Sequence, residues 1–329
     1  MKALDVHFMV KELQDLIGAK VDKIFQQGDE LIVSLHKKGK ILLKINPEAA
    51  HITNYKFEES KPPSFCMYMR KFLNQARITK IVQRGFERII EIRLQKLEEY
   101  VLIIELFSKG NVILCESNMK IMMPLHTQEW KDRTVKRGVT YVYPPSLKYD
   151  PLYMQEEHFE KIEKENLVKT LAINFGLGGD YAEEVCLRAN VDKNKKKVTK
   201  EDAKKLISAT KRILTEKLKP NKVDGDIFSF ELKAHEGKKE FYKTLSEGLD
   251  QYYKECVSED KTFQKRVKKS KKLIEKQKRH VEKLKKSADE DKQKGDLIYN
   301  NYPYIQEVID TIKEARNKKI AWDEITKKL

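Results

Sequence analysis

The sequence predicts an α+β protein in three parts: a duplicated unit of helix and antiparallel sheet, a helical middle domain and a coiled-coil arm. Three observations support this. Apolar and polar residues alternate through much of residues 20–125, as they do in half-buried strands. Apolar residues recur at helical spacing after residue 161 and at seven-residue spacing after residue 260. The length of 329 residues suits two or three domains.

The duplication is visible in two stretches of the first domain. KVDKIFQQGDELIVSL at residues 20–35 and RITKIVQRGFERIIEI at residues 77–92 match at a constant offset of 57 positions. At this offset Gly28 corresponds to Gly85, and Glu30 corresponds to Glu87. Because only two copies occur, the self-similarity indicates a duplicated unit rather than a repeat array.

The first domain, residues 1–128, is expected to contain one helix followed by four strands, twice. Helices are predicted at 3–17, which Gly18 ends, and at 65–74, for which Ser64 is the predicted cap. The predicted strands are 21–26, 30–35, 40–45 and 51–54 in the first copy, and 78–83, 88–94, 100–107 and 112–116 in the second.

Residues 129–160 are predicted to form an irregular connector, because several prolines restrict its backbone. Residues 161–220 form the predicted helical middle domain, in which Thr199 and Asp202 have the spacing of a helix cap. Residues 221–244 alternate again and are expected to add two strands to the sheet already formed.

Residues 245–329 form the predicted coiled-coil region, with Gly295 separating two helices. Ser270 and Gln277 interrupt the apolar seam of the first helix, so the pattern favours half of an antiparallel hairpin over a strong dimer. The chain stops at Leu329 without a cap or a closing element, and we expect this arm to be truncated.

The formal net charge of +16 is concentrated in one segment. Residues 261–286 hold 13 Lys or Arg and two acids, which is +11 and leaves +5 for the rest of the chain. A basic helical rod favours a polyanionic partner through phosphate neutralisation, although a solvated lysine-rich face explains it equally well. The rod residues proposed to contact phosphates are Lys268, Lys269, Lys271, Lys272 and Arg279.

Gly176, Gly178 and Gly179 predict a tight turn between two helices, and Asp180 can cap the second helix. Such a turn can offer backbone N–H groups to a phosphate. It can also be a plain helical hairpin that needs positive φ, and a single GxGG pattern favours this simpler explanation.

Little in the sequence indicates catalysis or a cofactor. The four cysteines form no CxxC pair, the seven histidines are scattered, and the sequence has no Walker, GxSxG or Rossmann motif. We therefore expect no metal, no cofactor and no catalytic residue. Cys66 and Cys115 lie in apolar runs and are predicted to be buried thiols. The sequence shows no signal peptide or membrane span, which predicts a cytoplasmic protein with no membrane partner.

Arg88 marks the position at which the two copies diverge, since it replaces Leu31 of the first copy. An arginine oriented by Glu87 can form two hydrogen bonds to a phosphate or a base edge. A surface salt bridge, worth less than about 1 kcal/mol, is the alternative. The residues alone leave both explanations open, and they leave Asp5 without a clear role.

Six blocks of the sequence, in the same order, resemble the NFACT family, whose members are called NEMF in eukaryotes and RqcH in bacteria. The blocks are ALD at 3–5, PPSFCMYMRKFL at 62–73, RGFERIIEI at 84–92, IIELFSKGNVILCE at 103–116, YVYPP at 141–145 and GLGGDYAEEVCLRA at 176–189. The resemblance implies an N-terminal domain related in fold to that of formamidopyrimidine-type DNA glycosylases, a helix-hairpin-helix-like middle domain and a long antiparallel coiled coil. The family also carries an RNA-binding segment and a C-terminal domain after the coiled coil, which this sequence lacks.

The resemblance further implies a role in ribosome-associated quality control. The family binds large ribosomal subunits obstructed by peptidyl-tRNA, recruits charged tRNA and drives template-free C-terminal tailing of the stalled chain. Its tRNA-contacting acids and arginine match Asp5, Glu87 and Arg88, although many relatives have Asp-Arg where this chain has Glu87-Arg88. The implied partners are large-subunit rRNA, tRNA and the peptidyl-tRNA nascent chain, and peptide transfer is left to the ribosome.

Two other functions follow from the same resemblance. The fold relation suggests a DNA-binding protein or a DNA glycosylase or lyase. Those enzymes use an N-terminal Pro-Glu, whereas this chain starts Met1-Lys2-Ala3 and has no zinc-finger cysteines. An older family label suggests a surface adhesin, which the missing signal peptide and the basic rod disfavour.

Overall fold

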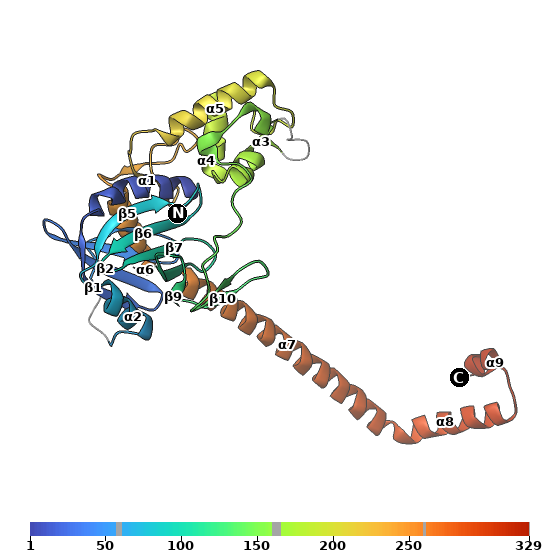
Figure 1. Cartoon of the computed structure of the whole chain (residues 1–329). Helices are drawn as coiled ribbons and strands as arrows, with labels where there is room; N and C mark the ends of the chain where they lie inside the picture. Colours follow the sequence, from blue (N-terminus) through green and yellow to red (C-terminus); the bar gives the residue numbers. More distant parts are fainter. Residues whose placement is uncertain (57–60, 160–165, 259–260, 329) are drawn as a thin grey trace. The chain divides into compact units, whose positions relative to one another are not determined.

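The structure is a computed structural model that describes residues 1–56, 61–159, 166–258 and 261–328. It divides into two compact units, Met1–Glu255 and Cys256–Leu329, and each is considered by itself (Figure 1). The first unit contains the duplicated sheet and the middle domain, so it carries most of the predicted site residues.

The first unit is built on one antiparallel sheet in the order β4-β3-β2-β1-β5-β6-β7-β8-β9. The predicted α+β fold with a duplicated helix-and-sheet domain is confirmed, and strand ends agree with the predictions to within about two residues. The short strand β9 was not predicted. The strands are β1 Lys20–Gln27, β2 Glu30–His36, β3 Lys40–Ile45, β4 Ala50–Thr53, β5 Arg77–Gln83, β6 Ile89–Gln95, β7 Glu99–Glu105, β8 Asn111–Glu116 and β9 Ile121–Pro124.

The two copies meet where β1 runs antiparallel to β5. The Val21 N–H donates to the Ala76 carbonyl at 2.9 Å, and the Ile78 N–H donates to the Ala19 carbonyl at 2.9 Å. The two bonds are equivalent in the two copies. At the 57-residue offset Val21 corresponds to Ile78 and Ala19 corresponds to Ala76, so each bond matches the other. The register of each copy also shifts at matching positions, after Val21 in β1 and after Ile78 in β5. The duplication therefore includes an irregularity that the sequence pattern does not reveal.

Two helices cover one face of this sheet. Helix α1 (Ala3–Leu13) packs against β5, and helix α2 (Ser64–Leu73) packs against β1, so each helix covers the first strand of the other copy. A 3₁₀ turn, Gln14–Leu16, continues α1. The predicted cap of the second helix was wrong: Pro63 holds the N-cap position and Ser64 is already helical.

The predicted connector covers the opposite face of the sheet. A hairpin of β10 (Gln128–Glu129) and β11 (Thr134–Val135) precedes the irregular proline segment. Val135 and Tyr141 form a second small core with strand residues such as Ile103. Beneath them, Arg133 and Glu105 form a buried ion pair at 2.7 Å, and the Tyr141 hydroxyl donates to the same carboxylate at 2.7 Å. The connector is therefore part of the folded domain.

The middle domain is helical, as predicted. It contains α3 (Leu167–Lys169), a π-helical turn (Thr170–Asn174), α4 (Gly179–Ala189) and α5 (Lys200–Leu214). The predicted cap of α5 is confirmed, since the Thr199 hydroxyl accepts from the Asp202 N–H and the Asp202 carboxylate accepts from the Thr199 N–H.

Residues 221–244 do not join the large sheet as predicted. They form a separate sheet in the order β13-β12-β14, with β12 Asn221–Val223, β13 Asp226–Phe228 and β14 Glu240–Phe241. This segment instead packs Phe228 and Phe230 against α4 and α1. This places an aromatic layer between the two domains.

Two predictions for residues 245–329 were also wrong. Helix α6 (Leu245–Ser258) lies in the first unit up to Glu255, because Leu245 and Leu249 are buried there and Glu12 of α1 accepts from its first N–H groups. In the second unit, Gly295 does not end a helix: α7 runs Lys261–Asn300, and α8 (Tyr302–Asn317) and α9 (Trp322–Lys328) follow. The antiparallel coiled-coil pairing stays a prediction.

The buried ion pair predicts a large loss of stability when one partner is neutralised. Glu105→Gln leaves the Arg133 guanidinium buried without its counter-charge, which is expected to lower the free energy of unfolding by about 3–5 kcal/mol. Urea denaturation at neutral pH measures this. The matched control is Glu129→Gln, whose exposed pair with Lys136 at 3.5 Å is worth at most about 1 kcal/mol. Equal losses in the two variants would contradict a structural role for the buried pair.

Candidate nucleic-acid interface

The hairpin that carries Glu87 and Arg88 differs from its counterpart in the first copy. In the first copy, β1 and β2 pair up to Gln27 and Glu30, so Leu31 lies inside a strand and is fully buried. In the second copy, pairing between β5 and β6 stops earlier, at Gln83 and Ile90. The four residues 85–88 therefore form an open loop.

Phe86 explains why this loop opens. Its side chain is 2% exposed and tilts toward His7 of α1, with the ring centroids 6.1 Å apart. The corresponding residue of the first copy, Asp29, is exposed at a two-residue turn. Burying an aromatic ring pulls the loop onto α1. Gln83 holds it there by donating to the carbonyls of Ala3 and Glu87 at 2.8 and 2.9 Å.

Glu87 and Arg88 take different positions in the open loop. Glu87 is partly buried, and its carboxylate accepts from the Leu147 N–H at 2.8 Å. Burial raises the pKa of Glu87, while that hydrogen bond and the nearby Arg88 act in the opposite direction. Arg88 is exposed, and its side chain has no ion pair or hydrogen bond within the described residues. The alternative explanation of Arg88, a surface salt bridge, therefore finds no partner among the described residues.

Asp5 lies in the interior and not on an open face. Its side chain is 5% exposed, and its carboxylate accepts from the hydroxyls of Tyr181 and Ser229, the latter at 2.9 Å. It also accepts from the N–H of Lys2 at 3.0 Å, at the start of α1. Of the tRNA-contacting residues that the resemblance implies, Arg88 is exposed and Asp5 is buried.

The charges of Asp5 and Arg88 nevertheless both affect the amino group of Met1. The amino group of Met1 donates to the Glu48 carbonyl at 2.9 Å. Burial lowers the pKa of this amino group, Asp5 and Glu48 counteract that effect, and Arg88 adds to it. The charges of Arg88 and Asp5 therefore act in opposite directions on the pKa of this amino group.

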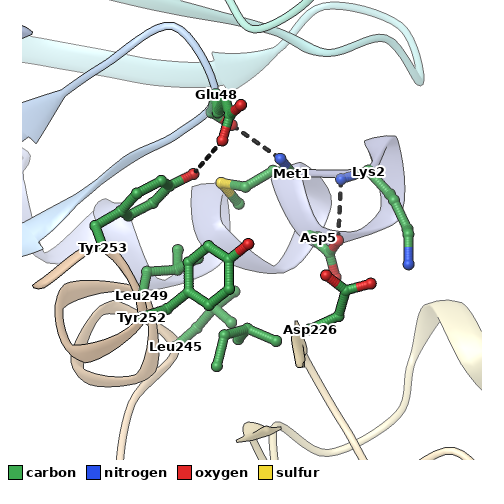
Figure 2. Close-up of a pocket in the computed structure, with 10 residues that line it drawn as sticks. Met1, Lys2, Asp5, Glu48, Asp226, Leu245, Leu249, Tyr252 and Tyr253 are labelled. Carbon is green, nitrogen blue, oxygen red and sulfur yellow. Dashed lines mark hydrogen bonds between the residues drawn. The ribbon is translucent and has the colours of Figure 1, made fainter. Parts of the chain in front are cut away.

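A small pocket lies beside the start of α1. It has a volume of about 240 Å³, and Figure 2 shows Met1 and Asp5 on one side and Leu245, Leu249 and Tyr252 of α6 on the other. Lys2, Glu48 and Asp226 add charged side chains to its lining.

The glycine turn packs against the first domain. Gly176 has a φ of +66°, and a side chain there would meet Leu147 at 2.5 Å. Gly178 has a φ of +77° and lies against the side chain of Lys2, whereas Gly179 is exposed. The turn thus needs glycine for backbone conformation and close packing, which is the simpler of its two explanations. Phosphate contact by these glycines stays a prediction.

Asp180 does not cap α4 as predicted. Gly178 is the N-cap residue, and Asp180 lies in the first turn of the helix. Its carboxylate pairs with Lys2, and with His235 at 3.3 Å. Burial opposes ionisation of Asp180, but the hydrogen bond and charge of Lys2 outweigh it and lower its pKa. The pair therefore joins α1 to α4.

The predicted rod residues lie in α7, but most of their side chains fall outside the described part of the chain. This applies to Lys268, Lys269, Lys271 and Lys272. Arg279 is exposed. Contact of the rod with phosphates therefore stays a prediction.

The described residues contain no cluster of three or more His, Cys, Asp or Glu side chains placed to hold a metal ion. None of the helices in that part of the chain combines the length and the apolar character that crossing a bilayer requires. Cys66 and Cys115 are buried thiols, as predicted. Burial raises the pKa of Cys115 to about 12, so this thiol is a poor nucleophile.

Sequence reasoning missed three residues that organise this region. Tyr181 and Ser229 bind the Asp5 carboxylate, and Leu147 offers its N–H to Glu87. Tyr181 lies one residue after the predicted cap Asp180, and Ser229 lies in an apolar alternating run. Both positions look like ordinary core or loop residues, and no local pattern connects them to Asp5.

The Asp5–Tyr181 contact predicts coupled effects on stability. Tyr181→Phe removes a buried hydrogen bond and is expected to lower the free energy of unfolding by about 1–3 kcal/mol. Tyr153→Phe, at a residue that is 74% exposed, is the control and is expected to change little. Combined with Asp5→Asn, Tyr181→Phe should show a coupling energy of about 0.5–3 kcal/mol in a double-mutant cycle. Strict additivity would rule out a direct interaction.

Residues 3–328 match the family model described as NFACT N-terminal and middle domains. The chain is 31% identical to the archaeal Rqc2 homolog aRqcH of Methanocaldococcus jannaschii, over 98% of this chain and 53% of that protein. It is 25% identical to the ribosome quality control complex subunit NEMF of Homo sapiens, over 98% of this chain and 34% of that protein. The chain thus spans about half the length, or less, of these relatives.

The fold is also similar to a solved structure, the N-terminal part of the fibronectin/fibrinogen-binding protein from Streptococcus suis. The TM-score is 0.67 at 24% identity, and the match covers 78% of this chain and 99% of that one. At this level of identity the likeness shows a common fold. The family model covers nearly all of both structural units, and the chain therefore belongs to the NFACT family.

Proposed function

We propose that this chain is the tRNA-binding part of a ribosome-associated quality-control factor, and that Arg88 makes the tRNA contact. The family match over residues 3–328, to relatives named for ribosome quality control, carries the proposal. The guanidinium of Arg88 in the opened hairpin supports it, since it is exposed and pairs with no other residue in the described part of the chain. A planar guanidinium with five donors suits two-point contact with a phosphate or a base edge.

Asp5 and Glu87 act through Arg88 in this proposal. Glu87 fixes the loop by accepting from the Leu147 N–H, and Asp5 fixes the start of α1 on which Phe86 and Gln83 rest. Both carboxylates are satisfied within the chain, so they position the arginine and leave its donors open to the RNA. A preorganised side chain loses less entropy on binding than a mobile one.

The complete protein, in this proposal, binds large ribosomal subunits obstructed by peptidyl-tRNA and recruits charged tRNA there. Template-free tailing of the stalled chain then follows, with peptide transfer performed by the ribosome. The chain acts as an adaptor in the cytoplasm, and its rod residues in α7 contact rRNA. Relatives across archaea and eukaryotes that carry quality-control names support this role.

The alternatives have less support. A DNA glycosylase or lyase rests on a fold relation alone, and fold does not establish function. The Streptococcus suis neighbour is named for binding fibronectin and fibrinogen, but at 24% identity it supports a shared fold only. The quality-control names of the sequence relatives therefore support the proposed role over these two alternatives.

Arg88 provides the test. Arg88→Ala is expected to weaken tRNA binding about 10- to 100-fold, since a hydrogen bond to a charged group is worth about 1.5–3 kcal/mol. Fluorescence anisotropy with labelled tRNA and the full chain measures this. Arg88→Lys keeps the charge but loses the two-point geometry, and it should give an intermediate loss.

Lys80→Ala is the matched control, because Lys80 is an exposed cation on the neighbouring strand β5. Its tRNA affinity should stay within about twofold of the unchanged chain. If Arg88→Ala binds tRNA as tightly as Lys80→Ala does, the assigned role of Arg88 is wrong.

A further inference from the structure

A basic groove lies on the middle domain, apart from Arg88. Two adjoining depressions of about 580 and 600 Å³ share Arg188, Glu216 and Lys233 on their walls. Helix α4, helix α5 and the segments at residues 216–219 and 230–239 line them. In Figure 1, α4 is green and α5 is yellow. Eight Lys or Arg residues line the two depressions against two acids, Glu216 and Glu231.

The walls of this groove are fixed by a buried carboxylate. Glu184 of α4 is fully buried, and it accepts from Arg188 and from the N–H groups of Lys233 and Ala234 at 2.8 and 3.0 Å. Arg188 also donates to the Glu231 carbonyl at 3.4 Å. This network holds the segment that carries Lys233 beside α4. The groove is therefore preorganised rather than a chance gathering of mobile lysines.

Part of the positive charge is compensated within the chain. Lys219 and Lys239 both pair with Glu231, at 2.8 and 3.2 Å, and their hydrogen bonds lower its pKa. Arg188 is neutralised by Glu184 and Glu216. Lys204 and Lys205 also form ion pairs, with Glu156 at 4.0 Å and with Glu201 at 2.7 Å. Three of the eight groove cations remain.

Arg212, Lys217 and Lys233 are exposed and make no side-chain ion pair or hydrogen bond with any other residue that the structure describes. Lys204, Ser208 and Arg212 recur every four residues on one face of α5, so they follow the groove for about 12 Å of helix. The helix dipole can account for Arg212, which lies in the last turn of α5. It does not account for Lys217 or Lys233, which lie outside the helix.

We propose that this groove binds the phosphate backbone of a structured RNA. Arg212, Lys217 and Lys233, which pair with no other described residue, can each contact a phosphate, and each contact releases a counterion. The cations of the groove indicate a ligand with an anionic backbone. That this ligand is RNA rests on the proposed function. The middle domain would thus bind RNA through α5 and the Lys233 segment, on a surface distinct from the glycine turn.

The test substitutes the three unpaired cations together, as Arg212→Gln, Lys217→Gln and Lys233→Gln in the full chain. The matched control changes three exposed cations outside the groove, Lys200→Gln, Lys211→Gln and Lys238→Gln. Both triple variants lose the same net charge at exposed positions. Thermal unfolding of both confirms that the fold is retained, since none of these side chains is buried.

Binding is measured from 50 to 400 mM salt, with tRNA and with deproteinised large-subunit rRNA as separate probes. The groove variant should bind at least one RNA about tenfold or more weakly at 0.1 M salt. The slope of log affinity against log salt should become shallower by about 2–3, because each phosphate that is no longer neutralised lowers it by about one. The control variant should show less than about half of that slope change.

The two probes distinguish the source of the RNA. A weakening confined to tRNA assigns the groove to tRNA, a weakening confined to rRNA assigns it to the ribosome, and either supports the proposal. Equal salt slopes and affinities for the groove and control variants, with both probes, would overturn it. Arg88→Ala, measured alongside, reports on the proposed function separately, because Arg88 lies outside the groove.

Discussion

The buried carboxylate of Asp5 joins the parts of the first unit. It accepts hydrogen bonds from the start of α1, from Tyr181 of α4 and from Ser229 after β13, three segments that are far apart in the sequence. A buried polar group costs free energy unless it is hydrogen-bonded, so these three contacts help to hold their segments together. Together with the Lys2–Asp180 pair, they join the start of α1 to the middle domain.

The duplication supplied two similar units, and small changes gave them different roles. The β1–β5 contact keeps matching hydrogen bonds on both sides, which shows that the pairing interface is shared by both copies. In the second copy a buried Phe86 opens the hairpin and turns a core position, equivalent to Leu31, into the exposed Arg88. The buried Phe86 and the substitution of Leu31 by Arg88 thus distinguish the candidate binding surface from its scaffold counterpart.

Both candidate RNA contacts rest on the same physical arrangement. A partly or fully buried carboxylate accepts backbone N–H groups and so fixes the segment that carries an exposed cation. Glu87 does this for the loop of Arg88, and Glu184 does it for the segment of Lys233. The acids satisfy the backbone inside the protein while the cations keep their donors for a ligand. This arrangement reduces the entropy lost when the ligand binds.

The sequence by itself determined the helices and all strands but β9 of the predicted first domain, the 57-residue duplication, the cap of α5 and the divergence at Arg88. All of these depend on local periodicity or on residues close together in the chain. Only the tertiary structure decided that Asp5 is interior, that the connector closes one face of the sheet, and that residues 221–244 form a sheet of their own. It also brought together Arg188, Arg212 and Lys233, whose separation along the chain hides the groove. Contacts between distant segments are set by packing and by the need to satisfy buried polar groups, and no local pattern encodes them.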